Sequence, residues 1–318
     1  MNNPAVPLCV PAVTIPPPSR VAVVVNPFAR RAHEALASVG AKCRDLGIGA
    51  PVTLFTTESE PGAPQARAAL DQGADLVVVV GGDGTVREVA KELMGTDVAL
   101  GILSRGSGNV LAHNLRLTQL DLTRQVDVAL TGVVAMIDVG RVELTIADGT
   151  VREEIFTTMV GIGRDAEAIE ATRYETKRFI GWVAYAAQGA KAALSPALDM
   201  KVGLDGAPEV PVTTWTVLIG LTPSTPGGLT VYPDAQLDDG LLHVLRVPIT
   251  HPWQWVKAAR IGLITPRGNT DVLDYDDARE VVVYPKEPQA TQLDGDVIAD
   301  VVELRARIVP GQLQVRVY

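Results

Sequence analysis

The stretch Leu76-Val77-Val78-Val79-Val80-Gly81-Gly82-Asp83-Gly84-Thr85 decides the fold of this chain. Its apolar, mostly β-branched first half is typical of a strand buried on both faces, as in a parallel sheet. The glycines let the backbone turn tightly and approach a ligand closely. The helical pattern that follows at residues 86–94 would direct free N–H groups toward the turn, which suits a phosphate. The alternative is a plain strand-to-helix turn in which Asp83 caps the helix.

The same alternation extends on both sides of this stretch. Strands are predicted at 21–25, 52–55 and 99–103, and helices at 33–46, 63–71 and from residue 110. This order predicts a doubly wound, Rossmann-like α/β domain with ligands at the carboxyl ends of its strands. A second glycine loop, Gly106-Ser107-Gly108-Asn109, should lie beside the first. We expect it to contact phosphate or ribose, and a polar loop in which Ser107 or Asn109 caps the next helix is the alternative.

Beyond about residue 121 the chain changes to many short strand candidates separated by Gly, Pro and Asp. This pattern, with helical interruptions that include residues 166–193, predicts a second domain that resembles a β-sandwich. We predict three parts: a disordered Pro-rich tail at 1–19, an α/β nucleotide-binding domain at 20–125 completed by residues 311–318, and the sandwich-like domain at 126–310.

Composition excludes several classes of protein. The 318 residues include 28 basic and 37 acidic side chains, for a formal charge of −9. A general nucleic-acid binder would present a basic face instead. No stretch reaches the roughly 20 apolar residues of a membrane span, and two cysteines are too few for a disulfide framework. We expect a cytoplasmic protein with no nucleic-acid partner and no transmembrane anchor.

Together the two glycine loops resemble the catalytic domain of the diacylglycerol kinase family, which includes bacterial lipid kinases and sphingosine and ceramide kinases. Further segments that resemble the family follow in order along the chain: Val25-Asn26-Pro27, Thr57-Glu58, Gly161–Asp165, Pro233–Leu242 and Leu293–Asp296. The likeness spans roughly residues 21–310. In the second loop, Gly106–Ala112 is closer to the sphingosine and ceramide kinase branch.

The resemblance implies an ATP-dependent kinase that acts with Mg²⁺. It implies nucleotide contacts at Asn26, Thr57, Gly81, Gly82, Asp83, Gly84, Thr85, Glu88, Gly106, Ser107 and Asn109. Asp83 would contact the nucleotide or its Mg²⁺. Asp296, where the family more commonly has glutamate, would take the proton of the acceptor alcohol, and Asp294 is the alternative base. A plain Asp-Gly hairpin turn is the other interpretation of this loop.

The resemblance also implies a structural Mg²⁺ in the turn before residue 242. Its ligands would be the Asp239 carboxylate and the main-chain carbonyls of Gln236 and Leu241. Oxygen ligands suit this ion, and a solvated acidic turn is the alternative. His243 stands where family members often carry aspartate.

The implied substrate is diacylglycerol, sphingosine or a related lipid of phospholipid metabolism, reached by brief peripheral contact with a membrane surface. The edges of the sandwich are candidate surfaces for a homodimer. Two other functions stay open. One is a kinase with a soluble substrate, such as an NAD kinase, which shares Gly-Gly-Asp-Gly-Thr. The other is a nucleotide- or lipid-binding regulator that has lost catalysis, which the aspartate at position 296 suggests.

Overall fold

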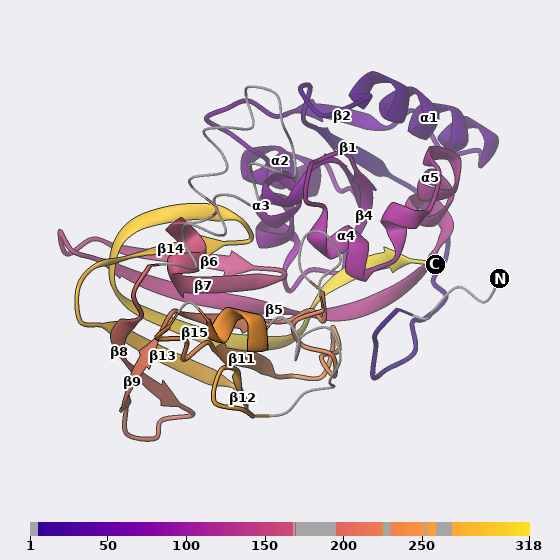
Figure 1. Cartoon of the computed structure of the whole chain (residues 1–318). Coiled ribbons are helices and arrows are strands. Elements are labelled where there is room, and N and C mark those ends of the chain that lie inside the picture. The colour runs from indigo at the N-terminus through magenta and orange to yellow at the C-terminus, as the bar shows by residue number, and fades with distance from the viewer. Residues whose placement is uncertain (1–5, 168, 170–194, 225–229, 252, 259–268) are drawn as a thin grey trace.

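The computed structural model of the chain describes residues 6–167, 169, 195–224, 230–251, 253–258 and 269–318. An N-terminal part, in which helices surround a parallel sheet, adjoins a C-terminal part made of β-strands (Figure 1). The helix predicted at residues 166–193 lies almost entirely outside the described residues.

A parallel sheet forms the centre of the N-terminal part. Its strands are β1 (Val21–Val25), β2 (Val52–Phe55), β3 (Leu76–Gly81) and β4 (Ala99–Ser104), in the spatial order β2-β1-β3-β4. The helices are α1 (Ala32–Asp45), α2 (Ala63–Asp71), α3 (Asp83–Leu93), α4 (Val110–Asn114), the 3-10 turn η1 (Leu117–Gln119) and α5 (Leu122–Thr131). β1 lies between β2 and β3, so the direction of winding reverses there. The predicted Rossmann-like α/β arrangement is confirmed.

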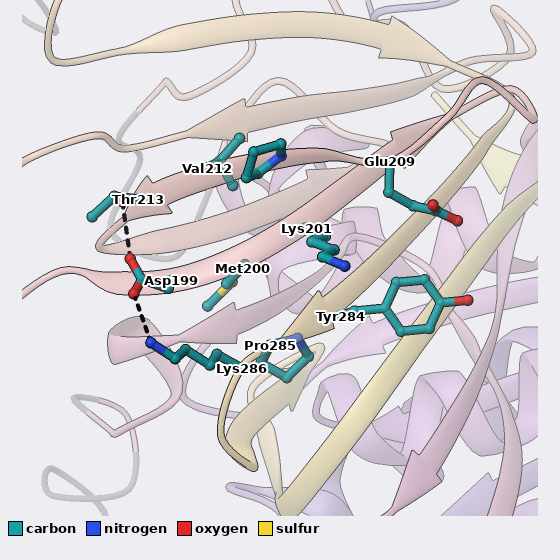
Figure 2. A pocket seen from close by; sticks show the side chains of 10 residues that line it. Asp199, Met200, Lys201, Glu209, Val212, Thr213, Tyr284, Pro285 and Lys286 are labelled. Carbon is teal, nitrogen blue, oxygen red and sulfur yellow. Dashed lines mark hydrogen bonds and ion pairs between the residues drawn. The ribbon is translucent and has the colours of Figure 1, made fainter.

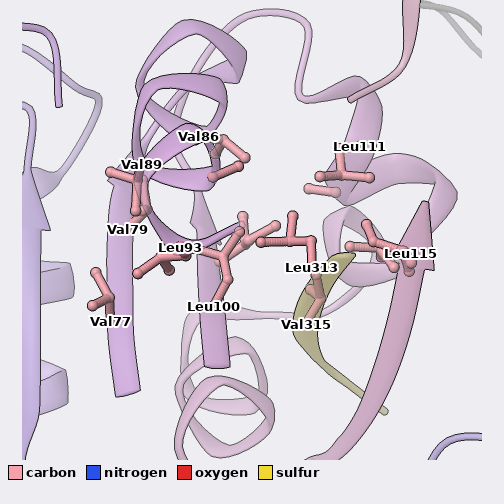
Figure 3. Close-up of a cluster of buried hydrophobic side chains, with 14 of the residues drawn as sticks. Val77, Val79, Val86, Val89, Leu93, Leu100, Leu111, Leu115, Leu313 and Val315 are labelled. Carbon is pink, nitrogen blue, oxygen red and sulfur yellow. The ribbon is translucent and has the colours of Figure 1, made fainter. Parts of the chain in front are cut away.

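Both faces of the strands β1, β3 and β4 are buried, and these strands carry almost only apolar side chains. Val77 and Val79 of β3 belong to the same buried cluster as Val89 and Leu93 of α3 (Figure 3). The intervening residue Val78 belongs to a second cluster, which also holds side chains of α1 and α5. Successive residues of a strand point to opposite faces, so an unbroken run of valines supplies both cores.

The C-terminal part is a β-sandwich whose two sheets share one strand. The strands are β5 (Val133–Ile146), β6 (Val151–Phe156), β7 (Met159–Gly163), β8 (Leu198–Leu204), β9 (Val210–Thr214), β10 (Thr216–Gly220), β11 (Leu242–Arg246), β12 (Asp274–Ala278), β13 (Glu280–Pro285), β14 (Gln289–Leu293) and β15 (Asp296–Val317). One sheet has the order β12-β11-β10-β7-β14-β15, and the other β9-β8-β13-β15-β5-β6. Side chains from both sheets form one buried cluster. The predicted sandwich is therefore confirmed.

The long strand β15 connects the two parts of the molecule (Figure 1). It pairs first with β14 and then with β13, and from Val301 to Val317 it also pairs with β5. At Val315 it pairs with β4 of the parallel sheet. Leu313 and Val315 thereby join the core beneath α3 (Figure 3). The division into domains stays a prediction. Its expected boundary at residue 125 lies within α5, whose Val126 and Ala129 belong to a core of the parallel sheet.

The N-terminal tail is bound to the rest of the molecule where the structure describes it. Cys9 and Val10 donate their backbone N–H groups to the Asp238 carboxylate, at 2.5 and 2.7 Å. Val13 and Val134 exchange two backbone hydrogen bonds of 2.7 Å at the start of β5. The structure thus gives residues 6–19 contacts with distant parts of the chain, and the disorder of the tail stays a prediction. The partners of this segment are supplied by distant residues, which the proline content of the tail does not reveal.

Candidate active site

The two glycine loops lie against each other at the carboxyl edge of the parallel sheet. Gly81 and Ser104 are opposite each other at the ends of β3 and β4, and Arg105 donates its backbone N–H to the Gly81 carbonyl at 2.8 Å. A Cβ atom on Gly106 would lie 2.5 Å from the Cα atom of Gly82. The backbones can approach this closely only because neither residue has a side chain.

Asp83 connects the two loops. Its carboxylate accepts the backbone N–H groups of Asn109 and Val110, both at 2.6 Å. Asn109 has a left-handed backbone, and its side-chain oxygen accepts the N–H of Gly106 at 2.9 Å. Burial raises the pKa of Asp83 above its ordinary value, and the charge of Asp294 adds to this, although the two N–H donors act in the opposite direction. The Asp83 side chain thus holds the second loop in place.

Asp294 attaches the loop between β14 and β15 to the sandwich. Its carboxylate accepts five hydrogen bonds of 2.6–3.1 Å, from the N–H groups of Thr157, Thr158 and Met159 and from the two threonine hydroxyls. A carboxylate has about four lone-pair positions, so these donors saturate it. The Asp294 backbone is left-handed, with a φ of 47°. The Asp294 side chain therefore supports the structure of this loop.

Asp296 begins β15 and faces the first glycine loop. A Cβ atom on Gly84 would lie 3.6 Å from Oδ2 of Asp296. Arg87 of α3 donates to the same Oδ2 at 2.8 Å and to the Leu293 carbonyl at 2.7 Å. Burial lowers the pKa of Arg87, but the carboxylates of Asp294 and Asp296 outweigh it and hold the pKa above its ordinary value. The sequence analysis did not single out Arg87, which ties α3 to the carboxylate loop.

A cavity of about 350 Å³ lies where these elements meet. Its lining includes Asp83 and Gly84 from the first loop, Ser107 from the second, and Asp294 and Asp296 from the far end of the chain. The three predicted catalytic carboxylates and two residues of the predicted nucleotide site therefore share one cavity.

Other residues predicted to contact the nucleotide lie outside the lining of this cavity. Asn26 and Thr57 follow β1 and β2 at the same edge of the sheet. Their side-chain oxygens accept backbone N–H groups of the turns that follow, at 2.9 and 3.1 Å. Glu88 lies on α3, with its carboxylate 3.7 Å from the Arg87 guanidinium. Thr85 is buried, and its side chain occupies the space above Gly81.

The acidic turn before β11 is closed by hydrogen bonds to the Asp239 carboxylate. Oδ1 of Asp239 accepts the N–H of Leu241 at 3.0 Å, and Oδ2 accepts the N–H of Gln236 at 2.9 Å. Oδ2 also faces Nε2 of His243 at 3.0 Å. Gln236 and Leu241, whose main-chain carbonyls the resemblance implies as Mg²⁺ ligands, thus donate their N–H groups to this carboxylate. The ligand set Gln236, Asp239 and Leu241 stays a prediction.

A larger cavity, of about 760 Å³, lies in the sandwich along β8, β9 and β13 (Figure 2). Met200 and Tyr284 are among its lining residues. At one end the Asp199 carboxylate accepts a hydrogen bond from Thr213 at 3.0 Å and lies 3.4 Å from the Lys286 ammonium (Figure 2). None of the residues predicted for catalysis or nucleotide binding lines this cavity.

Asp165, which follows β7, has a buried carboxyl group in a residue that is otherwise half-buried. Its Oδ1 accepts the Thr216 hydroxyl. A Cβ atom on Gly161 would lie 2.2 Å from its Oδ2, so glycine is needed there. Burial, the largest influence, raises the pKa of Asp165 to about 6.

Replacing Asp165 with asparagine should weaken the pH dependence of stability. Because folding raises the pKa from 3.8 to about 6, the group stabilises the fold below its unfolded pKa, and this contribution is lost as pH rises through 6. Urea unfolding should show wild type losing up to about 3 kcal/mol relative to Asp165→Asn between about pH 4 and pH 8. Asp45→Asn, exposed at the end of α1, is the control. Parallel profiles for wild type and Asp165→Asn would contradict the assignment.

The arrangement of a glycine-loop α/β sheet against a β-sandwich defines the fold that diacylglycerol kinases and NAD kinases share. A crystal structure of a diacylglycerol kinase from Bacillus anthracis str. Sterne matches with a TM-score of 0.69 at 17% identity, covering 95% of this chain and 97% of that one. Yeast NADH kinase in complex with NADH matches with a TM-score of 0.51 at 13% identity, covering 95% and 84%.

Comparison of sequences places the chain within this class. The family model described as diacylglycerol kinase catalytic domain matches residues 20–142. The model described as YegS C-terminal NAD kinase beta sandwich-like domain matches residues 158–317. A diacylglycerol kinase of Mycobacterium tuberculosis (strain CDC 1551 / Oshkosh) is 29% identical over 229 residues, 71% of this chain and 72% of that protein. The chain belongs to the diacylglycerol kinase family of lipid kinases, and the predicted resemblance is confirmed.

In the part of the chain that the structure describes, no helix has the length and apolar character needed to cross a membrane.

Proposed function

We propose that this chain transfers the γ-phosphate of ATP to a hydroxyl group of a lipid such as diacylglycerol or sphingosine. The observation that carries the proposal is the 350 Å³ cavity, in which Gly84 and Ser107 of the two glycine loops meet Asp296. Phosphoryl transfer to an alcohol needs a cradle for the phosphates and a carboxylate that takes the alcohol proton. Membership of the family supports the kinase class.

The first loop and the start of α3 would receive the phosphates of ATP. The first N–H groups of a helix have no partner within the helix, and they carry the positive end of its dipole. Here these groups belong to Asp83, Gly84 and Thr85, with the Ser107 hydroxyl bordering the same cavity. Mg²⁺ would arrive with ATP and neutralise charge on its phosphates. The Asp83 carboxylate uses two of about four acceptor positions for N–H groups, so it can also receive this ion or its water.

Asp296 would take the proton of the acceptor hydroxyl. As the hydroxyl oxygen bonds to the γ-phosphorus, the bond from that phosphorus to the oxygen bridging to the β-phosphate breaks, and ADP leaves. The side chain of Asp296 is 39% exposed, so a substrate can reach it. Arg87 holds the carboxylate toward the cavity at 2.8 Å. The five donors on Asp294 favour Asp296 over it as the base.

The size of the cavity suggests how a lipid would bind. A volume of 350 Å³ accommodates the polar end of a lipid but not two acyl chains, so the chains would stay near the surface or in the bilayer. The proposal therefore includes brief peripheral contact with a membrane. A cytoplasmic location, a role in phospholipid metabolism and a homodimer stay predictions.

Purified protein incubated with radiolabelled ATP, Mg²⁺ and single acceptors would test this function. We expect labelled product with at least one of diacylglycerol, sphingosine, ceramide and monoacylglycerol in mixed micelles, and none with NAD. Transfer to NAD alone would favour the kinase with a soluble substrate, whose fold is the same. ATP binding without transfer to any acceptor would favour the regulator that has lost catalysis.

A further inference from the structure

The N-terminal segment, residues 6–19, begins beside the turn that leads into β11 of the sandwich. The carbonyl of Pro7 accepts the backbone N–H of Leu237 in this turn at 2.9 Å. The Asp238 carboxylate accepts two backbone N–H groups of the segment, at 2.5 and 2.7 Å. Three hydrogen bonds thus attach the first half of the segment to the turn.

The second half of the same segment is attached to the parallel sheet. Val13 exchanges two backbone hydrogen bonds of 2.7 Å with Val134 at the start of β5. Ile15 packs against the core that α1 and α5 share with the sheet. Ser19 donates its backbone N–H and its hydroxyl to the Asp75 carboxylate, both at 2.7 Å, directly before β3. The segment therefore passes from the sandwich to the parallel sheet (Figure 1).

The segment crosses the place where β5 and β15 pass from one part of the molecule to the other. Ile308 of β15 packs against the core of the sandwich, whereas Leu313 belongs to the core of the parallel sheet. Between Val309 and Leu313 the register shifts, so that three residues of β15 stand against Asp138 of β5 alone. Such a bulge bends a pair of strands. A left-handed backbone at Gly311, with a φ of 58°, lies within it.

This bulge is not closely packed. A cavity of about 510 Å³ lies beside it. Its lining includes three residues of the segment and three at the bulge, namely Val10, Pro11, Val13, Asp138, Pro310 and Gly311. Close packing makes protein interiors resist deformation, so an open space at the bulge leaves the two strands free to bend there. The segment forms one wall of this space.

We propose that residues 6–19 form a strap that limits bending of β5 and β15 at the bulge. The cavity of the candidate active site is lined by Asp83 from one part and Asp296 from the other. By restraining the two parts, the strap keeps the spacing of these two carboxylates constant. The two family models match residues 20–142 and 158–317, so the strap precedes both matches. The proposal concerns the relative motion of the two parts and does not depend on the reaction.

Hydrogen–deuterium exchange of the wild-type chain tests whether the strap is in place. The backbone N–H groups of Cys9, Val10 and Val13 donate hydrogen bonds in the structure. Resolved by fragmentation and mass spectrometry, they should exchange at least roughly tenfold more slowly than in a free peptide of the same sequence. Exchange at the rate of the free peptide would support the predicted disorder of the tail and overturn the proposal.

A distance measurement between the two parts tests what the strap does. Spin labels would be attached at Ala37→Cys on α1 and at Glu143→Cys on β5, both at exposed positions. Cys9→Ser removes the exposed native thiol and keeps its backbone N–H, while Cys43 is buried and stays unlabelled. Double electron–electron resonance then gives the distribution of distances between the labels in the full chain.

The strap is released in this labelled chain by combining Val13→Pro with Asp238→Ala. The two changes remove one donor and the acceptor of two others, so the distribution should become roughly twice as wide or move by several ångströms. Val13→Thr keeps the N–H and the β-branched shape and should match the unreleased chain. Equal distributions in the released chain and in Val13→Thr would overturn the proposal. Should the combined variant not fold, Val13→Pro alone, at a residue that is 61% exposed, is compared with Val13→Thr in the same way.

Discussion

Replacing Asp296 with asparagine should lower kcat by roughly 10²- to 10⁴-fold while the KM for ATP stays within about threefold. Asparagine keeps the shape of the side chain and can still accept the Arg87 hydrogen bond seen at 2.8 Å, but it cannot take the proton of the acceptor hydroxyl. The proposed phosphate cradle, at Gly82 and Gly106, does not include Asp296, so ATP binding should persist. Steady-state kinetics with the preferred lipid acceptor, together with ATP binding by calorimetry, would measure both quantities.

Two further variants serve as controls. Asp296→Glu keeps the carboxylate and introduces the glutamate that the family more commonly has at this position, so it should retain turnover within about tenfold of wild type. Asp300→Asn changes an exposed aspartate of the same strand and should leave turnover unchanged. Wild-type turnover in Asp296→Asn would assign the proton transfer to a different group.

Replacing Asp294 with alanine should destabilise the protein by roughly 3 kcal/mol or more. The change leaves five donors of Thr157, Thr158 and Met159 without their acceptor. It also places alanine at a φ of 47°, which disfavours residues with a Cβ other than Asn and Asp. Turnover should fall as well, because the loop positions Asp296. Urea unfolding and kinetics on the same preparation would measure the two effects.

Asp294→Asn and Asp148→Ala are the matched controls. Asparagine tolerates the left-handed backbone and keeps one acceptor oxygen, so its loss of stability should lie between wild type and alanine. Asp148 caps an exposed turn through one hydrogen bond to the Thr150 N–H, so its removal should cost less than about 1 kcal/mol. If Asp294→Ala unfolds at the same urea concentration as wild type, the five hydrogen bonds do not support the loop.

The elements of the parallel sheet could be predicted because their signals are local. The strand at 76–80 and the helix at 63–71 have bounds that match the structure or differ from it by one residue. A short apolar run closed by Gly or Pro specifies a buried strand without knowledge of its neighbours. The two glycine loops were likewise expected to lie side by side, and in the structure a Cβ atom on Gly106 would lie 2.5 Å from the Cα atom of Gly82.

The edge strand β12 could not be predicted from its sequence. Asp274–Ala278 has three acidic side chains in five residues, which is unusual for a strand. It forms because β11 supplies cations directly across the sheet: Arg246 pairs with Asp274 and Asp276, and His243 pairs with Asp277. The pattern of one segment does not show which cations its neighbour will offer.

The role of Arg87 also could not be predicted from the sequence. It follows the apolar Val86 on α3, and no motif of the sequence singles it out. In the structure it is 8% exposed and reaches the carboxylate loop from the other end of the chain. A buried arginine is stable only with partners, and its side-chain hydrogen bonds here go to Leu293 and Asp296, at separations of 206 and 209 residues.

The sequence by itself determined the family, the two kinds of fold and the place of the glycine loops, because these depend on short runs of residue types. The tertiary structure alone decided what each aspartate does. Asp83 joins two loops, Asp294 anchors a third, Asp239 pairs with His243, and Asp296 faces the cavity. The four carboxylates are chemically identical in the chain. They differ because folding brings a different set of N–H, hydroxyl and cationic donors to each. For Asp83, Asp294 and Asp296 these donors come from residues distant in the sequence, whereas those of Asp239 lie within its own turn and the strand that follows.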